Sequence, residues 1–140
     1  MPGILPQPPA APCAGSRRET RTVRTCPCGL PAPYDDCCGR YHRGAAAPTA
    51  EALMRSRFSA FAVGDAAHLH ASWDPETRPR RVDVDPGTRW TRLEVLDRTG
   101  GGLLESTGTV EFRAHHDGGV VAEHSRFRRV DGRWVYVGPV

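Results

Sequence analysis

The sequence predicts an α+β fold in which helices come first and a meander of antiparallel strands follows. Residues 50–70 repeat apolar side chains at helical spacing, whereas residues 90–137 hold short segments with strand signals. Turn signals separate these segments, and Asp-Gly pairs are typical of tight hairpins. Helices followed by hairpins predict a sheet packed against the helices. The 140 residues suffice for one domain with a small appendage.

The first predicted helix begins after Thr49, which suits a helix N-cap, and ends at Gly64, a candidate C-cap. Its apolar residues recur at helical spacing and are Leu53, Met54, Phe58, Phe61 and Ala62. Asp65 is expected to cap a second, short helix that runs through His70. Residues 75–89, with three prolines and mixed charge, are expected to form a loop.

Four strands are predicted after this loop. They are residues 90–97, 103–114, 120–130 and 133–137. In the second strand alternate residues share a face, and one face holds Gly108, Val110, Phe112 and Ala114. One face of the sheet is therefore expected to pack on the helices, while the other meets solvent, a pocket or a partner.

Four of the five cysteines lie within thirteen residues, and they are Cys26, Cys28, Cys37 and Cys38. Thiolates are preferred zinc ligands, and two close pairs joined by a loop can complete a tetrahedral site. The glycines after each pair suit sharp turns beside the ligands. Because the segment has few apolar residues, metal binding is expected to fold it. One structural zinc ion is therefore predicted.

Two alternatives to this site remain open. His42 follows Cys37 at a plausible ligand spacing and could replace Cys38 as the fourth ligand. Redox thiols or strained disulfides are the other alternative, although adjacent cysteines bridge poorly to each other. The chain opens without a secretory signal, and clustered cysteines in a protein that is not exported favour a metal site in the cytoplasm.

The N-terminal leader, residues 1–25, differs in composition from the rest of the chain. It is rich in proline and arginine and has no apolar periodicity, so disorder is expected. The leader accounts for the whole net charge of +3, because the 15 arginines and 15 acids of residues 26–140 cancel. A neutral body does not have the basic footprint of a dedicated nucleic-acid binder. No segment approaches the roughly 20 apolar residues of a membrane helix.

The motif Cys26-Pro27-Cys28-Gly29, an eight-residue gap and Cys37-Cys38-Gly39 resembles the SEC-C zinc motif at the end of the bacterial translocation ATPase. The run from Tyr41 to Phe61, with later matches at 108–112, 125–127 and 132–134, resembles the YchJ-type family of uncharacterised bacterial proteins. This resemblance implies a SEC-C zinc segment at 26–47 and a cone-shaped domain of the nuclear transport factor 2-like fold at 48–140. It also implies that the zinc ligands are Cys26, Cys28, Cys37 and Cys38.

Two functions are compatible with the sequence. A non-enzymatic interaction or adaptor module is favoured, and the SEC-C resemblance implies a protein partner related to secretion or the ribosome. The alternative is a small-molecule-binding protein or enzyme that uses a cavity between the helices and the sheet. No phosphate-binding loop or nucleophile elbow is evident, and no residue is assigned a catalytic role. Polar groups that converge inside an apolar cavity would favour the alternative.

Arg57 is the charged residue of the first helix that falls inside its apolar arc. Either its stem packs and its guanidinium reaches solvent, or the charge is buried and paired with a carboxylate of the sheet. Glu111 is the first predicted partner and Glu123 is the second. Arg57, Trp73 and Glu111 are the candidate residues of a ligand pocket.

Overall fold

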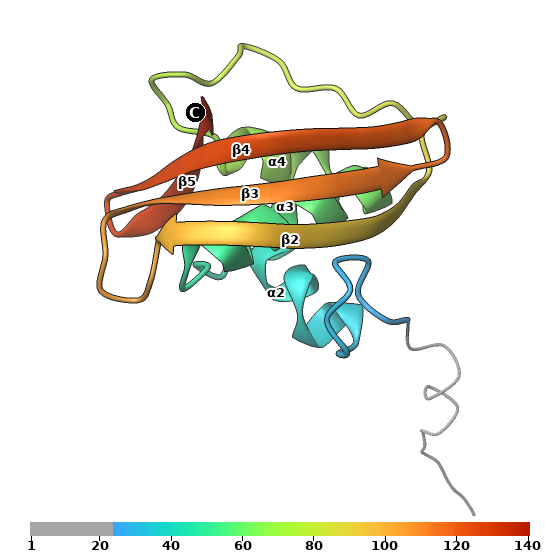
Figure 1. Ribbon diagram of the computed structural model, residues 1–140, viewed down its shortest axis with the longest axis horizontal. Helices are drawn as coiled ribbons and strands as arrows, with labels where there is room; N and C mark the ends of the chain where they lie inside the picture. The colour runs from blue at the N-terminus through green and yellow to red at the C-terminus, as the bar shows by residue number, and fades with distance from the viewer. Residues whose placement is uncertain (1–23) are drawn as a thin grey trace, which may run out of the picture.

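The computed structural model describes residues 24–140, which form two layers and a small cysteine-rich segment (Figure 1). One layer is a four-stranded antiparallel sheet, and the other consists of helices that cover a single face of it. The cysteine-rich segment, at the blue end of the colour scale, lies beside the helices. The predicted α+β class and its order of elements are therefore confirmed.

The central helix is α3 (Ala50–Val63), and both its ends are where the sequence predicts them. The Thr49 hydroxyl accepts a backbone N–H hydrogen bond of 3.0 Å, and Gly64 closes the helix in the left-handed conformation with φ of 83°. The shorter α4 (Ala66–Ala71) follows, and the Asp65 side chain caps it by accepting a backbone N–H at 2.9 Å. Local capping chemistry therefore sets the bounds of both helices.

The sheet has the strand order β2-β3-β4-β5, so each strand pairs with its neighbours along the chain. The strands are β2 (Trp90–Gly100), β3 (Thr107–His116), β4 (Gly119–Val130) and β5 (Arg133–Pro139). Register shifts interrupt the β2–β3 and β4–β5 pairings, and such irregularities bend strands. Figure 1 shows β5 turning away from the direction of the other strands.

The connection between β2 and β3 differs from the prediction. β2 continues to Gly100 instead of ending at residue 97, and β3 begins at Thr107 instead of residue 103. Gly100 and Gly101 adopt positive φ values of 62° and 76°, which glycine tolerates without strain. A Cβ on Gly108 would lie 2.5 Å from Gly101, so glycines let the strand ends approach. The apolar residues after this turn, which resemble a strand start, are exposed loop residues and include Leu104.

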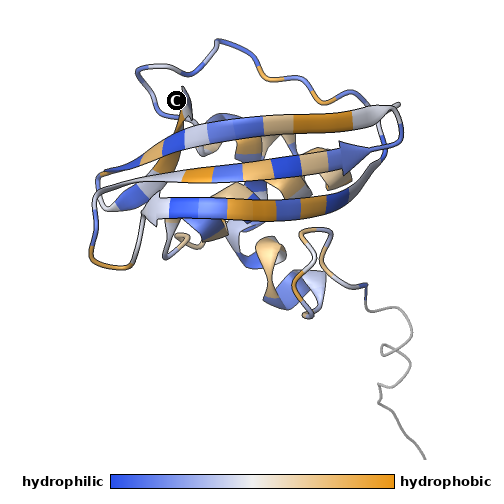
Figure 2. Cartoon of the chain, viewed as in Figure 1, coloured by the Kyte–Doolittle hydropathy of each residue, from blue (hydrophilic) through white to orange (hydrophobic). Residues whose placement is uncertain are grey.

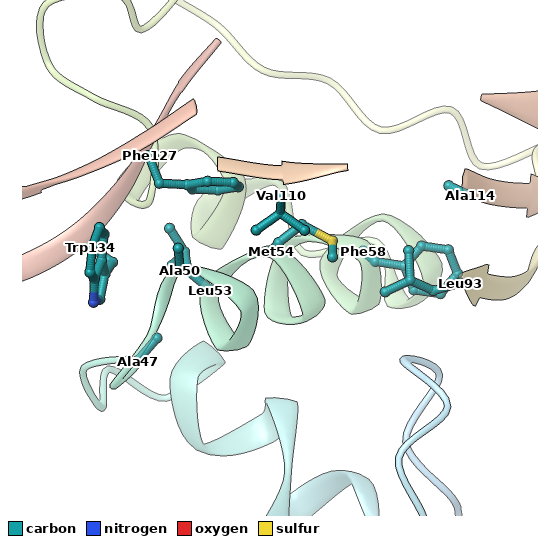
Figure 3. Close-up of a cluster of buried hydrophobic side chains, with 10 residues drawn as sticks. All are labelled: Ala47, Ala50, Leu53, Met54, Phe58, Leu93, Val110, Ala114, Phe127 and Trp134. Atoms are coloured by element: carbon teal, nitrogen blue, oxygen red, sulfur yellow. The ribbon is translucent and has the colours of Figure 1, made fainter. Parts of the chain in front are cut away.

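The hydrophobic core lies between α3 and the inner face of the sheet (Figure 3). Its ten buried residues are Ala47, Ala50, Leu53, Met54, Phe58, Leu93, Val110, Ala114, Phe127 and Trp134. The alternation predicted for β3 is confirmed, because Val110 and Ala114 are buried while Glu111 and Arg113 are exposed. Figure 2 shows hydrophobic and hydrophilic residues alternating in short bands along the strands.

The cysteine-rich segment already begins with two residues that the prediction assigns to the leader. Thr25 forms an isolated β-bridge with Pro33, and the guanidinium of Arg24 lies 4.5 Å from the ring centre of Tyr34. A 3₁₀ turn (η1, Tyr34–Asp36) and a short helix (α2, Cys38–His42) follow. The prediction of disorder for the rest of the leader lies outside the described residues. No helix within residues 24–140 is long and apolar enough to cross a membrane.

Candidate metal centre and ligand cavity

The thiols of Cys26, Cys28, Cys37 and Cys38 lie within 4.8 Å of one another, and all four side chains are buried. Cys28 Sγ and Cys37 Sγ are 3.7 Å apart. A tetrahedral zinc ion with bonds of about 2.3 Å places its sulfurs about 3.8 Å apart, so the donor set fits such an ion. All four cysteines are free, which disagrees with the disulfide alternative. The cluster can therefore hold a metal ion.

Backbone turns bring the two cysteine pairs together. Gly29 has a φ of 96°, and its N–H donates to the Cys26 carbonyl oxygen at 3.2 Å. The Cys26 N–H in turn donates to the Ala32 carbonyl oxygen at 3.0 Å, which closes the loop. At the second pair, a Cβ on Gly39 would lie 2.7 Å from the Tyr34 carbonyl oxygen. Both glycines singled out in the sequence therefore shape the site.

The thiols differ in their affinity for protons. A hydrogen bond from the Cys38 thiol lowers the pKa of Cys28 to about 5. Burial, reinforced by the negative charge of Cys28, raises the pKa of Cys37 to about 12. The hydrogen bond to Cys28, together with burial, raises the pKa of Cys38 as well. One thiolate is therefore favoured in the cluster, and a divalent cation that binds it would displace the remaining thiol protons.

His42, the alternative fourth ligand, is held by other partners. Its Nε2 donates to the Ser56 carbonyl oxygen at 2.8 Å, and its Nδ1 lies 2.5 Å from the Tyr34 hydroxyl. Because a carbonyl oxygen can only accept, Nε2 carries the proton and Nδ1 accepts from Tyr34. Both ring nitrogens are thus engaged, and the geometry favours Cys38 over His42 as a ligand.

Further contacts seat the cysteine-rich segment on α3. Arg55 donates to the Cys28 carbonyl oxygen at 2.9 Å, and Ser59 Oγ lies 3.5 Å from Cys26 Sγ. Arg55 also pairs with Glu51 at 2.9 Å. By helical periodicity, Arg55 and Ser59 fall on the side of α3 opposite to the side that packs on the sheet. The helix is therefore covered from two sides.

A cavity of about 340 Å³ lies between α3 and the inner face of the sheet. Seven of its thirteen lining residues are aromatic, and they are Phe58, Phe61, Trp73, Trp90, Phe112, Phe127 and Tyr136. Three more carry polar side chains, namely Arg57, Glu123 and Ser125. Small-molecule sites in proteins occupy about 300–1,000 Å³ and combine apolar walls with a few polar groups, so this cavity lies at the small end of that class.

Arg57 is the buried cation of this cavity, and its side chain lies on the packed face of α3 as the sequence predicts. The residue is 7% exposed, and its guanidinium lies 4.4 Å from the ring centre of Tyr136 and 4.9 Å from that of Trp73. Its Nη1 donates to the Leu69 carbonyl oxygen at 2.9 Å and to the Ser72 hydroxyl at 2.8 Å. Burial lowers the pKa of Arg57 to about 10, so it remains charged at neutral pH.

The predicted ion pair between Arg57 and Glu111 was wrong. Glu111 is exposed on the outer face of the sheet, because side chains alternate along β3 and its neighbours face inward. Glu123 does line the cavity, but its Oε2 accepts hydrogen bonds of 2.6 Å from the hydroxyls of Ser125 and Tyr136. Within residues 24–140, Arg57 hydrogen-bonds only to neutral oxygens. Aromatic rings and neutral acceptors therefore make the direct contacts to this cation, and the Glu123 carboxylate acts on it from beyond ion-pair distance.

Trp73 reaches the cavity because the chain after α4 lies against β5. It forms a parallel bridge with Tyr136, and the Asp74 N–H donates to the Tyr136 carbonyl oxygen at 2.8 Å. Asp74 is 2% exposed and accepts hydrogen bonds of 2.5 and 2.9 Å from Arg128. These bonds hold the pKa of Asp74 below its usual range. The ion pair between the buried Asp74 and the partly exposed Arg128 thus fixes the segment that carries Trp73.

Sequence reasoning missed three residues of this region. Ser125 shares a strand face with Glu123, so alternation along the predicted strand could have found it. Tyr136 lies on the inner face of β5, where the same signal was present. Asp74 had no such signal, since its partner Arg128 is 54 residues away.

A helical layer on an antiparallel sheet with a cavity between them, preceded by four clustered cysteines, defines a nuclear transport factor 2-like domain with a SEC-C motif. Residues 49–139 match the family described as "YchJ, middle NTF2-like domain". The chain belongs to this YchJ family, whose members are also called UPF0225 proteins.

Relatives at high identity come from several bacteria. A UPF0225 protein of Streptomyces coelicolor is 61% identical over 112 residues, which cover 79% of this chain and 90% of that one. Another from Corynebacterium glutamicum is 54% identical over 117 residues, covering 81% and 94%.

Solved structures of similar proteins show the same fold. The solution structure of a SEC-C motif containing protein from Rhodopseudomonas palustris is 36% identical and has a TM-score of 0.71 over 84% of this chain and 98% of that one. The crystal structure of another from Psychrobacter arcticus is 28% identical, with a TM-score of 0.65 and coverages of 84% and 82%. The family resemblance inferred from the motifs is thus confirmed.

Proposed function

We propose that Cys26, Cys28, Cys37 and Cys38 bind one zinc ion, and that the ion is structural. Support comes from the sulfur spacing of 3.7 Å and from the burial of all four thiols. Zinc with four protein ligands has no open position for water, so its bonds hold the segment at residues 26–47 together. Free thiols suit a reducing compartment, which supports the expected cytoplasmic location.

We further propose that residues 48–140 bind a small organic molecule in the cavity between α3 and the sheet. The observation that carries this proposal is the polar group set of Arg57, Glu123, Ser125 and Tyr136 inside an aromatic-lined cavity of about 340 Å³. Polar groups that converge inside an apolar cavity favour a small-molecule-binding protein. This arrangement therefore reverses the preference for an interaction module that the sequence alone supports.

The interaction module is the second candidate, because one apolar side chain is exposed on the cysteine-rich segment. Leu30, between the two cysteine pairs, is 41% exposed. A single exposed leucine is common on protein surfaces and does not define a partner. The cavity is therefore the stronger basis for a function.

Nuclear magnetic resonance of the zinc-loaded chain with a library of small organic fragments tests the ligand proposal. Fragments are expected to shift amide signals on the inner face of the sheet and to leave those of the cysteine-rich segment unchanged. Val121 lines the cavity and is 43% exposed, so Val121→Trp should fill its mouth and abolish binding. The matched control is Ala122→Trp, since the exposed Ala122 points to the opposite face.

Three results would contradict the proposals. Equal fragment binding by both tryptophan variants, or no inner-face shifts with any fragment, would argue against a ligand cavity. Elemental analysis of protein purified without chelator should give one zinc per chain, and a chain without metal would overturn the zinc site.

A further inference from the structure

The chemistry of the cavity also defines a class of ligand, and this inference rests on the proposed function. We propose that the cavity binds a small aromatic carboxylate. The Arg57 guanidinium holds the carboxylate group, and the ring of the ligand packs among the aromatic side chains of the cavity wall.

Arg57 has hydrogen-bond donors to spare. A guanidinium has five N–H groups, and the two on Nη1 are used by Leu69 and Ser72. Within residues 24–140, Nε and Nη2 of Arg57 form no hydrogen bond. In that range, Trp73 Nε1 is the one side-chain polar atom that is both fully buried and without a hydrogen-bond partner. The nitrogens of Arg57 without partners are therefore not fully buried and remain accessible. Because Arg57 lines the cavity, these donors are available to a ligand there.

The charge of Arg57 calls for an anion. A buried charge is costly unless it is paired. Glu123 acts on Arg57 only from a distance, and no carboxylate of the described chain forms an ion pair with the guanidinium. A carboxylate matches the planar fork of a guanidinium and can accept two parallel hydrogen bonds. The rings of Tyr136 and Trp73 hold the guanidinium by cation–π contacts at 4.4 and 4.9 Å. The donor fork is therefore already oriented before a ligand arrives.

The remaining walls define the rest of the ligand. Aromatic side chains pack well against another ring in offset or edge-to-face arrangements. The volume of about 340 Å³ fits a small ligand. Glu123 lines the same cavity and disfavours a second acidic group by like-charge repulsion. The expected ligand therefore has one carboxylate and an otherwise uncharged aromatic body.

Paired titrations with benzoate and its neutral isostere benzamide test this inference on the full zinc-loaded chain. Affinity is measured from the inner-face amide shifts and from tryptophan fluorescence, because Trp73 and Trp90 line the cavity. Benzoate should bind about tenfold more tightly than benzamide, as expected for hydrogen bonds to a charged group. Arg57→Met should remove this preference, and Arg57→Lys, which keeps the charge without the fork, should retain part of it.

The control and the contradicting results separate the two proposals. Arg113→Met removes an exposed arginine from the outer face of the same sheet and should leave the benzoate preference unchanged. Equal affinity for benzoate and benzamide, or an unchanged preference in the Arg57 variants, would overturn the carboxylate class while leaving the cavity as a binding site. If neither these probes nor any fragment shifts inner-face signals, both proposals are overturned.

Discussion

The cysteine-rich segment and the sheet of the α+β domain lie against opposite sides of α3, and the segment and the domain have very different interiors. In the segment, the buried residues that cluster are the four cysteines themselves, with only Ala32 and Tyr34 packed around them. In the domain, ten buried apolar residues form a core between α3 and the sheet. Hydrophobic burial therefore accounts for the stability of the domain, whereas we expect the segment to depend on bonds to the proposed metal ion.

This contrast also separates the two proposed roles. The segment encloses a site whose donors are all turned inward toward one another, which suits a structural ion. The domain encloses a cavity in which Arg57 has hydrogen-bond donors without partners, which suits a reversibly bound ligand. If the two regions are as independent as their interiors suggest, a substitution in one should leave the other unchanged.

The largest expected effect comes from Cys28→Ser. Losing one of four ligands should release the zinc, whose binding is worth about 10–16 kcal/mol in small zinc peptides. Hydrogen–deuterium exchange should then show residues 26–40 unprotected, with β2 to β5 still protected. Cys13→Ser, at the cysteine outside the described residues, should change neither zinc content nor exchange. Loss of protection in the sheet as well would mean that the two regions unfold as one.

Arg128→Met should destabilise the domain by about 2 kcal/mol, because it leaves the buried Asp74 carboxylate without two hydrogen bonds, while the partial exposure of Arg128 keeps the loss below that of a fully buried ion pair. Urea denaturation with zinc present measures the change. Arg126→Met, at an exposed position on the same strand, should stay within about 0.5 kcal/mol of the unmodified protein. Equal losses in both variants would show that the Asp74 pair contributes nothing specific.

His68 should make stability depend on pH. Burial, with His42 nearby at 4.6 Å between ring centres, lowers the pKa of His68 to about 4, against about 6.5 when unfolded. The unfolded chain thus binds this proton at a higher pH than the folded chain. Stability should fall as the pH drops from about 6.5 toward 4, by about 1–2 kcal/mol between pH 7 and 5.

Comparison of the unmodified protein with His68→Gln isolates this effect, because any loss of zinc at low pH affects both. His42, Asp65 and Arg57, whose charges act on His68, are unchanged in the variant. Urea denaturation at pH 5, 6 and 7 should show a flatter pH dependence for His68→Gln. Parallel curves for the two proteins would mean that His68 does not titrate as expected.

The smallest effect is expected for deletion of residues 1–23. Composition predicts that this stretch buries no apolar face, so the melting temperature should change by no more than about one or two degrees. The deletion keeps Arg24 and Thr25, since both contact the cysteine-rich segment. A drop well beyond that range would show that the leader contributes to the fold.

Features set by neighbouring residues could be predicted from the sequence. Thr49 and Gly64 bound α3 through interactions within one helical turn, and the four cysteines lie within thirteen residues. The start of β3 was misplaced because Leu103 and Leu104 resemble strand residues, although the preceding glycines turn the chain first. Local signals therefore defined the elements and the metal cluster better than the loop between strands.

The cavity could be predicted only in outline. Helical periodicity placed Arg57 on the packed face, but the choice between Glu111 and Glu123 depends on which face of the sheet turns inward. One sequence does not fix that orientation, and the first choice was therefore the exposed residue. The pair of Asp74 and Arg128 joins positions 54 residues apart, so no local pattern could indicate it.

Native mass spectrometry of two variants tests the four-cysteine site, on which the contrast between the regions depends, most directly, because it counts the metal that each variant holds. Cys38→Ala removes a proposed ligand, whereas His42→Ala removes a residue that contacts Ser56 and Tyr34 instead of the cluster. We expect His42→Ala to retain one zinc per chain and Cys38→Ala to lose it. Retention of stoichiometric zinc by Cys38→Ala with loss in His42→Ala would contradict the four-cysteine site.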